Sequence, residues 1–547
     1  MGDIMRPVPF EELLTRIFDE YQQHHSIFGI PEQQFYSPAN QRRVSVFGES
    51  CATPIGPAAG PHTQLAQNII TAWLTGGRFI ELKTVQILDR LELEKPCIDA
   101  EDECFNTEWS TEFTLQKAWD EYLKAWFILH LLEEIFPFTP AKNGKSFIFN
   151  MSVGYNLEGI KQPPMQQFID NMMNAAGQPK FTQYRDTLNR WLHDDAFLTR
   201  LSLDDIRPRL ATLAERIPAK LVQGVTLSTM HGCPPDEIEA ICRYMLEEKQ
   251  LNTFVKLNPT LLGYPRVREI LDTCGFDYIG LNEESFEHDL KIGQALEMLT
   301  RLMALAKSKQ LGFGVKLTNT LGTVNNKGAL PGDEMYMSGR ALFPLSINVA
   351  ALLSREFDGK LPISYSGGAS QLNIRDIFET GIRPITMATD LLKPGGYLRL
   401  SQCMRELEQA DGWEMNQVDV KRLNALAEKA VSMEYTQKHW KPDDRIDVGE
   451  PLPLTDCYVA PCVSACAIKQ DIPEYIRLMG EQRYADALEL IYQRNALPAI
   501  TGHICDHQCQ YNCTRLDYDS ALNIRELKKI ALEKGWPEYQ RRWHKPA

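Results

Sequence analysis

The sequence predicts an α/β protein in which a (β/α)8 TIM barrel with helical insertions is followed by an all-α module rich in cysteine. Three observations support this class. Short apolar runs that end in small or polar residues alternate with longer amphipathic stretches, a pattern typical of βα units around a parallel sheet. The chain has 547 residues, enough for more than one core. Six of its 13 cysteines lie between residues 457 and 513.

The composition is that of a globular enzyme, and it argues against several classes of partner. Hydrophobic residues make up 44% and charged residues 24% of the chain. No window approaches the roughly 18 apolar residues that a membrane span requires. The N-terminus lacks the features of a secretory signal, so we expect a cytoplasmic protein. A net charge of −14 without a basic run argues against nucleic acid as a partner.

Four segments are expected along the chain. In order, they are an N-terminal helical segment (1–44), the barrel (45–400), a helical linker (401–448) and the cysteine-rich helical module (449–547). Two intervals inside the barrel, about 85–145 and about 155–220, are longer than a simple βα connection. We therefore predict helical insertions in both.

Nine segments are candidate strands for the eight barrel positions. They are 53–60, 78–84, 146–152, 222–229, 253–260, 277–282, 311–320, 362–368 and 384–390. Because the barrel has only eight strands, we expect one of them, 277–282 or 311–320, to be additional. The stretch 236–249 has apolar residues at helical spacing and predicts one of the helices between strands.

Small and polar residues stand at the carboxyl ends of several predicted strands, the end where barrels assemble their active sites. The residues are Ala58, Ala59 and Gly60, then Lys83 and Thr84, then Lys256 and Asn258, and then Lys316, Asn319 and Thr320. Their order along the chain resembles that of the dihydroorotate dehydrogenase-like barrel, which dihydropyrimidine dehydrogenase also carries. The resemblance covers about residues 45–400 and implies an FMN site.

The residue types suit that implied cofactor. Small residues let the backbone approach a planar ring. A lysine ammonium stabilises the negative charge that a flavin gains on reduction, and amides and hydroxyls can bind the edge of the ring. The same resemblance implies phosphate binding at the last strand ends, through Gly367, Gly368 and Thr389, with Ser338 and Gly339 in the same region. An ordinary turn is the alternative for the two consecutive glycines.

The loop HGCPPDEIEAI follows a predicted strand and contains Cys233. Its position resembles that of the catalytic cysteine acid of the dihydropyrimidine dehydrogenase barrel. The resemblance implies that this thiol exchanges a proton with a substrate carbon opposite the flavin. His231 is an alternative acid, and a purely structural loop cysteine is the other interpretation.

Cysteine spacing indicates a metal site in the C-terminal module. The pattern is Cys457-x4-Cys462-x3-Cys466 and, further along, Cys505-x3-Cys509-x3-Cys513. Soft thiolates select iron–sulfur clusters or zinc. Structural zinc usually shows paired Cys-x2-Cys motifs, and because none occurs here an iron–sulfur cluster is favoured. Zinc, or six separate buried thiols, are the alternatives.

The module resembles the iron–sulfur domain of dihydropyrimidine dehydrogenase and of the glutamate synthase small subunit. The segments CYVAPCVSACAIKQDIPEYIRLM, RNALPAITGHICDHQCQYNC and ALNIRELKK carry the likeness. The chain departs from the family pattern at two ligand positions, which fall at Leu454 and near Lys528. We therefore expect one [4Fe–4S] cluster from the six cysteines, whereas a second would need another ligand such as His503 or His507.

Along its whole length the chain resembles the bacterial selenate reductase iron–sulfur/FAD subunit family. That resemblance implies an oxidoreductase that relays electrons between [4Fe–4S] and FMN, with electron-transfer subunits and a molybdenum-containing oxidoreductase as partners. No G-x-G-x-x-G fingerprint occurs, so NAD(P)H and FAD are expected only through a partner or a further part of a longer polypeptide. A flavin-free barrel that docks an electron-transfer subunit, and a zinc-stabilised hydrolase, are the alternatives.

Overall fold

The computed structural model describes residues 6–39, 42–85, 87, 98–100, 105–106, 113–136, 145–154, 156–201, 203–228, 232–326, 332–440, 459–517 and 520–542. The chain divides into two compact units. The barrel unit comprises Phe10–Pro453, and the cysteine unit comprises Met1–Pro9 and Leu454–Ala547. Each unit has a hydrophobic core of its own.

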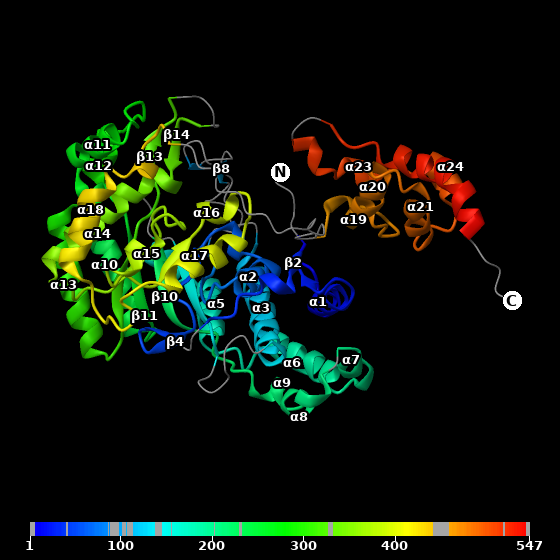
Figure 1. Ribbon diagram of the computed structural model, residues 1–547, viewed down its shortest axis with the longest axis horizontal. Coiled ribbons are helices and arrows are strands. Elements are labelled where there is room, and N and C mark those ends of the chain that lie inside the picture. Colours follow the sequence, from blue (N-terminus) through cyan, green and yellow to red (C-terminus); the bar gives the residue numbers. More distant parts are fainter. Residues whose placement is uncertain are drawn as a thin grey trace. The chain divides into compact units, whose positions relative to one another are not determined.

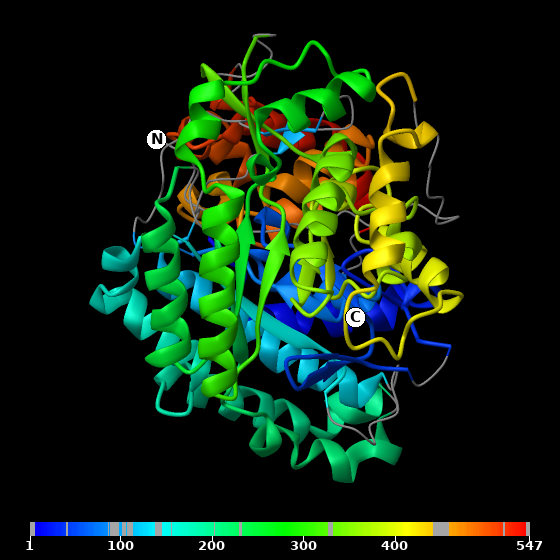
Figure 2. The same ribbon diagram turned by 90° about the vertical axis from the view of Figure 1, so that its left-hand side faces the viewer.

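Eight parallel strands form the sheet of the barrel unit (Figures 1 and 2), which confirms the predicted fold class. In chain order they are β5 (Ile55–Pro57), β6 (Phe79–Glu81), β9 (Ile148–Gly154), β10 (Val222–Ser228), β11 (Asn252–Leu257), β12 (Phe313–Leu317), β15 (Ile363–Tyr365) and β16 (Ile385–Met387). Their spatial order is β5-β16-β15-β12-β11-β10-β9-β6. The Arg78 N–H donates a hydrogen bond to the Ile55 carbonyl at 2.9 Å, which brings the two ends of this order together.

The additional candidate strand is 277–282. In the structure this segment makes only an isolated antiparallel bridge, between Gly280 and Val324. The other eight candidates supply the barrel strands, including β12 within 311–320. A barrel that is already closed by eight strands offers this ninth segment no edge to pair with.

The barrel strands are apolar because both of their faces are covered. Every residue of β9 and β12 is buried. Val225, Val255 and Val315, from three neighbouring strands, are all fully buried. Helices including α10 (Pro235–Glu247), α13 (Ile292–Ser308) and α14 (Phe343–Glu356) surround the sheet (Figure 1). This burial explains the continuous hydrophobic runs by which the strands were recognised.

Further helices occupy the described parts of the two long intervals. They are α3 (Leu115–Ile135), α5 (Pro163–Met173), α6 (Pro179–Leu192) and α7 (Asp195–Arg200), with shorter turns between them. The first interval also supplies β7 (Ile98–Asp99) and β8 (Phe105–Asn106), which join β13 (Leu321–Val324) and β14 (Glu334–Met337) in a small sheet. Because β13 follows β12 directly, this sheet begins at the carboxyl end of the barrel.

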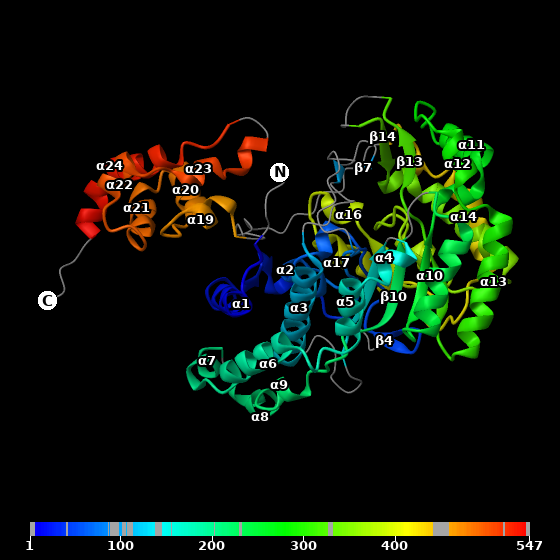
Figure 3. The same ribbon diagram turned by 180° about the vertical axis from the view of Figure 1, so that it is seen from behind.

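The cysteine unit is all-α, as predicted. Its helices are α19 (Pro461–Ala465), α20 (Ile472–Gly480), α21 (Tyr484–Tyr492), α22 (Pro498–Ile504), α23 (Gln508–Tyr511) and α24 (Ile524–Arg542), drawn in orange to red in Figure 3. Ile472, Tyr475, Leu478, Ile491 and Ala531 contribute to its core, which also includes Cys509.

Among the residues that the structure describes, no helix combines the length and the hydrophobicity that crossing a bilayer requires.

Candidate functional site

A buried ion pair lies inside the barrel. Lys316 of β12 and Glu81 of β6 are 3.0 Å apart (Nζ to Oε2), and their side chains are 1% and 2% exposed. The Lys316 ammonium also donates to Thr386 Oγ1 at 2.7 Å and to Ser364 Oγ at 3.4 Å. Three acceptors therefore hold Lys316 within the barrel, although its position at a strand end had suggested contact with a ligand.

The charges around Glu81 keep its carboxylate ionised. Burial by itself raises the pKa of Glu81, but the positive charges of Lys316 and Lys256 and hydrogen bonds from Lys316 and Thr226 lower it below its usual value. For Lys316, burial lowers the pKa and Glu81 opposes that effect. The two side chains thus depend on each other for their charged states.

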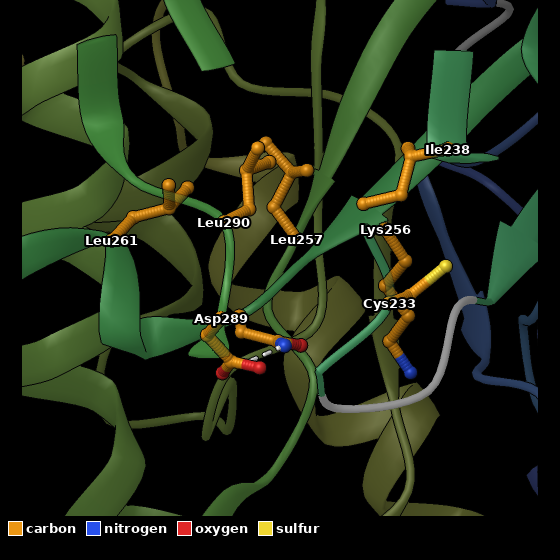
Figure 4. Close-up of a pocket in the computed structure, with 8 residues that line it drawn as sticks. Cys233, Ile238, Lys256, Leu257, Leu261, Asp289 and Leu290 are labelled. Carbon is orange, nitrogen blue, oxygen red and sulfur yellow. Dashed lines mark hydrogen bonds between the residues drawn. The ribbon is translucent and has the colours of Figure 1, made fainter. Parts of the chain in front are cut away.

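A small pocket lies at the carboxyl end of β11, next to the loop that follows β10 (Figure 4). Its volume is about 10 Å³, which suits a single water molecule. Cys233, Lys256, Asn258 and Asp289 supply its polar groups. The structure therefore brings together three residues that the sequence had singled out from two different strand ends, whereas Lys83 and Lys316 do not line this pocket.

Asp289 is the member of this group that the sequence did not reveal. It is 4% exposed and accepts hydrogen bonds from the Gly232 N–H at 2.5 Å, Thr260 Oγ1 at 2.7 Å and Asn258 Nδ2 at 3.2 Å. The Asn258 bond is the dashed line in Figure 4. Asn258 Oδ1 in turn accepts a hydrogen bond from Asn319 Nδ2 at 2.7 Å. This carboxylate fixes the loop before Cys233 to the strand end that carries Asn258.

Cys233 is half-buried and carries its proton at neutral pH. Burial, followed by the negative charges of Glu237 and Asp289, raises the pKa of its thiol to about 11. A protonated thiol at a barrel mouth can donate a proton but is a poor nucleophile. His231, the alternative acid, lies outside the described residues.

The remaining predicted ring contacts lie at the carboxyl ends of β5, β6 and β12. The Ala58 N–H donates to the Met387 carbonyl at 2.8 Å, and the Ala59 N–H donates to Glu81 Oε2 at 3.2 Å. The Lys83 carbonyl accepts from the Tyr122 hydroxyl at 2.9 Å. Both Ala58 and Lys83 are buried. The first of these strand ends is thus held directly against the Glu81 carboxylate.

Three further predicted ring contacts, Thr84, Thr320 and Gly60, have different surroundings. Thr84 Oγ1 shares a hydrogen bond with Ser152 Oγ at 2.7 Å, and Thr320 is half-buried. Gly60 has a φ of −170°, an extended conformation that any residue can adopt. No left-handed backbone conformation therefore requires a glycine at position 60.

The residues predicted to bind phosphate come together from three loops. Ser338 Oγ and Thr389 Oγ1 share a hydrogen bond at 3.1 Å. Gly339 and Gly368 have φ values of +74° and +69°, and a Cβ atom on Gly368 would lie 2.4 Å from the Gly339 carbonyl oxygen. A Cβ atom on Gly367 would lie 2.1 Å from Ser346 Oγ. Gly368 thus approaches the Gly339 backbone closely, and Gly367 approaches the Ser346 side chain closely.

Five of the six clustered cysteines are described, and thiols from both sequence motifs face one another. Burial raises the pKa of Cys462 to about 11; the charges of Cys509 and Cys513 add to this effect, and a backbone hydrogen bond at Val463 opposes it. For Cys509, burial and then the charges of Cys466 and Cys505 raise the pKa to about 11. Cys457 lies outside the described residues. The fold of the unit therefore gathers cysteines that are far apart in the sequence.

Within the described residues, no group of three or more His, Cys, Asp or Glu side chains is arranged to hold a single metal ion. That finding concerns single ions, because the thiolates around a four-iron cluster each bind a different iron atom. His503 is exposed, and the His507 ring stacks on Tyr511 with ring centres 5.4 Å apart. The backbone N–H of His507 donates to Cys505 Sγ at 3.3 Å, a contact that suits a thiolate acceptor.

Two protein families match this chain. Residues 28–438 match the family described as oxidoreductase YgfK, N-terminal TIM-barrel domain. Residues 453–539 match dihydropyrimidine dehydrogenase domain II, 4Fe-4S cluster. The second match identifies the cysteine unit as a 4Fe–4S domain and confirms the resemblance on which the cluster prediction was based.

Individual relatives match over very different lengths. The YgfK protein of Escherichia coli (strain K12) is 84% identical over all 547 residues, which make up 53% of that protein. The chain thus spans about half the length of this curated relative. The NADPH-Fe(3+) oxidoreductase subunit beta of Geobacter sulfurreducens (strain DL-1 / KN400) is 37% identical over 81 residues, 15% of this chain and 12% of that protein.

Among solved structures, the ligand-free DHODH of Eimeria tenella aligns with 72% of this chain and 93% of its own, at 15% identity and a TM-score of 0.37.

Proposed function

Because the chain belongs to the YgfK oxidoreductase family and carries a 4Fe–4S domain after its TIM barrel, we propose that it relays electrons between a [4Fe–4S] cluster and an FMN held in the barrel. The observation that carries this proposal is the meeting of Cys233, Lys256 and Asn258 at one pocket at the carboxyl end of the strands. A cation, a protonated thiol and an amide at that end of a barrel suit flavin-dependent redox chemistry.

The residues fit an FMN that spans two regions of the barrel mouth. Lys256 and Lys83 would face the part of the ring that becomes negative on reduction, and Asn258 and Asn319 would bind its polar edge. Thr84, Thr320, Ala58, Ala59 and Gly60 complete the proposed ring contacts. Bound FMN supplies the capacity to accept and release electrons in ones or twos, which links two-electron substrate chemistry to a one-electron cluster.

The phosphate of FMN would lie where Ser338, Gly339, Gly368 and Thr389 meet. Two adjacent hydroxyls and closely packed glycine backbone suit an anion. Gly367 supports that loop by its close contact with Ser346. Lys316 has a different role in this proposal, since its ammonium is held by Glu81, Thr386 and Ser364. It holds barrel strands together through that ion pair and those two hydrogen bonds.

Cys233 would exchange a proton with the substrate on the face opposite the flavin. Its raised pKa keeps a proton on the thiol, and the Asp289 hydrogen bond to Gly232 holds the loop in place. His231 is the alternative donor. Asp289 acts as a positioning residue and does not itself transfer the proton.

The cluster ligands would come from the six cysteines of the 4Fe–4S domain, Cys457, Cys462, Cys466, Cys505, Cys509 and Cys513. Four thiolates suffice for one [4Fe–4S] cluster. NAD(P)H and FAD would be bound by a partner subunit or by a further part of a longer protein. We propose electron-transfer subunits as partners in the cytoplasm, with a molybdenum-containing oxidoreductase among them.

Anaerobic purification of the chain tests this proposal directly. We expect a brown protein that contains iron and acid-labile sulfide and that, after cluster removal, retains a flavin absorbance at about 450 nm. Iron and sulfide without flavin would instead support the flavin-free docking barrel. A colourless protein without iron would contradict the proposed function altogether.

A further inference from the structure

A second pocket, here called the amino-end pocket, lies at the amino end of the barrel strands, away from the candidate functional site. It is lined by residues near the starts of β11, β15 and β16, by the hairpin of β3 (Val44–Val46) and β4 (Glu49–Cys51), and by the segment 413–418. Its volume is about 440 Å³. Small-molecule sites typically enclose about 300–1,000 Å³, so the amino-end pocket can hold a small organic ligand.

One wall of the amino-end pocket, the segment 413–418, is fixed to the barrel by backbone contacts. The Val418 N–H donates to the Gly359 carbonyl at 3.1 Å, and a Cβ atom on Gly359 would lie 2.2 Å from the Val418 carbonyl oxygen. At the other end of the segment, Arg383 donates to the carbonyls of Gly412 at 2.8 Å and Trp413 at 3.2 Å. Because this wall is preformed, a ligand can bind without the cost of ordering it.

The β3–β4 hairpin brings an aromatic side chain to the lining. Phe47, in its turn, has a φ of +49°, which is uncommon for a bulky residue. The Phe47 and Phe254 rings lie 4.5 Å apart between centroids, and a Cβ atom on Gly312 would lie 2.1 Å from Phe47 Cδ1. Trp413 contributes a third aromatic side chain to the lining. Aromatic side chains of this kind suit a flat apolar ring.

The lining has an excess of positive charge, although the whole chain carries a net charge of −14. Arg43, Lys360 and Arg383 line the amino-end pocket together with one acidic residue, Glu414. Lys360 also pairs with Asp358 at 3.5 Å, but their side chains are 69% and 81% exposed, so solvent weakens that pair. The excess of positive charge favours a negatively charged ligand.

Hydrogen bonds to uncharged acceptors hold the two arginines of the lining. Arg43 donates to Ser50 Oγ and to the Lys145 carbonyl, both at 2.6 Å, and Arg383 donates to the two carbonyls given above. Burial lowers the pKa of Arg383 to about 10, and the charge of Glu414 opposes that effect. The guanidinium therefore stays charged at neutral pH. These bonds position both cations without cancelling their charge.

We propose that the amino-end pocket binds a small aromatic anion, whose flat ring packs among Phe47, Phe254 and Trp413 and whose acid group is held by the positive charges of the lining. The site is independent of the proposed flavin site, which lies at the carboxyl ends of the strands. A bound ligand contacts both the β3–β4 hairpin and the segment 413–418. Binding should therefore also raise the melting temperature of the barrel unit.

Isothermal titration calorimetry of the anaerobically purified chain tests the ligand class with three probes. 1-Naphthoate carries a ring and a charge, 1-naphthamide carries the same ring without the charge, and acetate carries the charge without the ring. We expect 1-naphthoate to bind at least about tenfold more tightly than either of the others, because it alone uses both features of the pocket. Absence of 1-naphthoate binding, or equal binding of 1-naphthamide or acetate, would overturn the proposal.

Variants show where the probe binds. K360M removes an exposed charge of the lining and should weaken 1-naphthoate binding about two- to fivefold. K429M is the matched control, since it removes an exposed lysine charge in the last turn of α18 (Val420–Ala430), outside the lining. S45W places a large side chain at an exposed position of the lining and should abolish binding. Circular dichroism checks that each variant is folded.

The outcomes also separate this site from the proposed flavin site. Wild-type affinity for 1-naphthoate in K360M, or in a folded S45W, would overturn the inference, because the probe would then bind elsewhere. If S45W does not fold, the comparison of K360M with K429M decides. Excess FMN should leave the affinity for 1-naphthoate unchanged, whereas competition would place the probe at the flavin site and overturn the inference. A chain that binds 1-naphthoate as expected but no flavin would contradict the proposed function alone.

Discussion

At the scale of single residues, two lysines with similar sequence settings have different surroundings. Lys256 and Lys316 are partners in register on neighbouring strands. Lys316 is held by Glu81, whereas Lys256 lines the pocket with Cys233. The same side chain therefore takes part in a buried ion pair or lines a pocket, depending on what surrounds it.

The buried Glu81–Lys316 pair predicts a non-additive stability effect. We expect E81Q alone to lower the free energy of unfolding by about 3–5 kcal/mol, because it leaves a buried ammonium without its carboxylate. The double variant E81L/K316M should lose much less, since neither charge then needs a partner. Denaturant unfolding of both variants measures the difference, and equal losses would contradict the coupling of the two charges.

The raised pKa of Cys233 predicts the pH dependence of its reactivity. The thiolate is the reactive form, so alkylation of Cys233 should speed up about tenfold per pH unit and level off only near pH 11. E237Q removes one of the negative charges that raise this pKa, and it should shift the curve to lower pH. Mass spectrometry of the labelled peptide follows the rate. A plateau near pH 8 in the wild type would contradict the assigned environment.

At the scale of elements, loops at strand ends form the site, and each loop depends on a contact with another. The segment before Cys233 is fixed by Asp289, which ends α12 (Glu283–His288). The loop after β15 packs against the turn that begins with Gly339. These contacts explain how residues from distant parts of the chain reach one pocket or the proposed anion site.

The packing of Gly368 predicts a specific effect of an added methyl group. G368A combines a positive φ with a Cβ atom 2.4 Å from the Gly339 carbonyl oxygen. G396A is a matched control, since Gly396 also has a positive φ but has no atom within 4 Å of its Cβ position. We expect G368A to retain less flavin than the wild type and G396A to retain as much. Equal flavin content in both would argue against the proposed phosphate site.

At the scale of the whole molecule, two units with separate cores divide the chemistry. The barrel unit presents the proposed substrate and flavin site, and the cysteine unit is a 4Fe–4S domain. Cluster binding is expected to stabilise only the unit that supplies the ligands, because ligand binding to the native state adds its free energy to folding.

Iron removal should therefore affect one unfolding transition and leave the other unchanged. After anaerobic chelation, we expect calorimetry to show a lower midpoint temperature for the cysteine unit and an unchanged one for the barrel unit. Circular dichroism recorded at each temperature shows which unit has unfolded. Unfolding of the cysteine unit removes helical signal and leaves the strand signal of the barrel unit. A shift of both transitions would show that the two units do not unfold independently.

The sequence by itself determined the α/β barrel, the all-α cysteine module and most of the residues at the strand ends. Apolar runs and helical periodicity follow from local burial, and each can be recognised within a short window. The cysteine spacing likewise reflects a local constraint, since ligands on short helices must converge on one face.

Only the tertiary structure decided which polar residues meet. The roles of Asp289 and Glu81 depend on groups that are distant in sequence. The same is true of the segment 277–282, which looks like a strand but finds no edge in a barrel already closed by eight others. Local pattern sets whether a residue is buried, whereas chain closure in three dimensions sets what it is buried against.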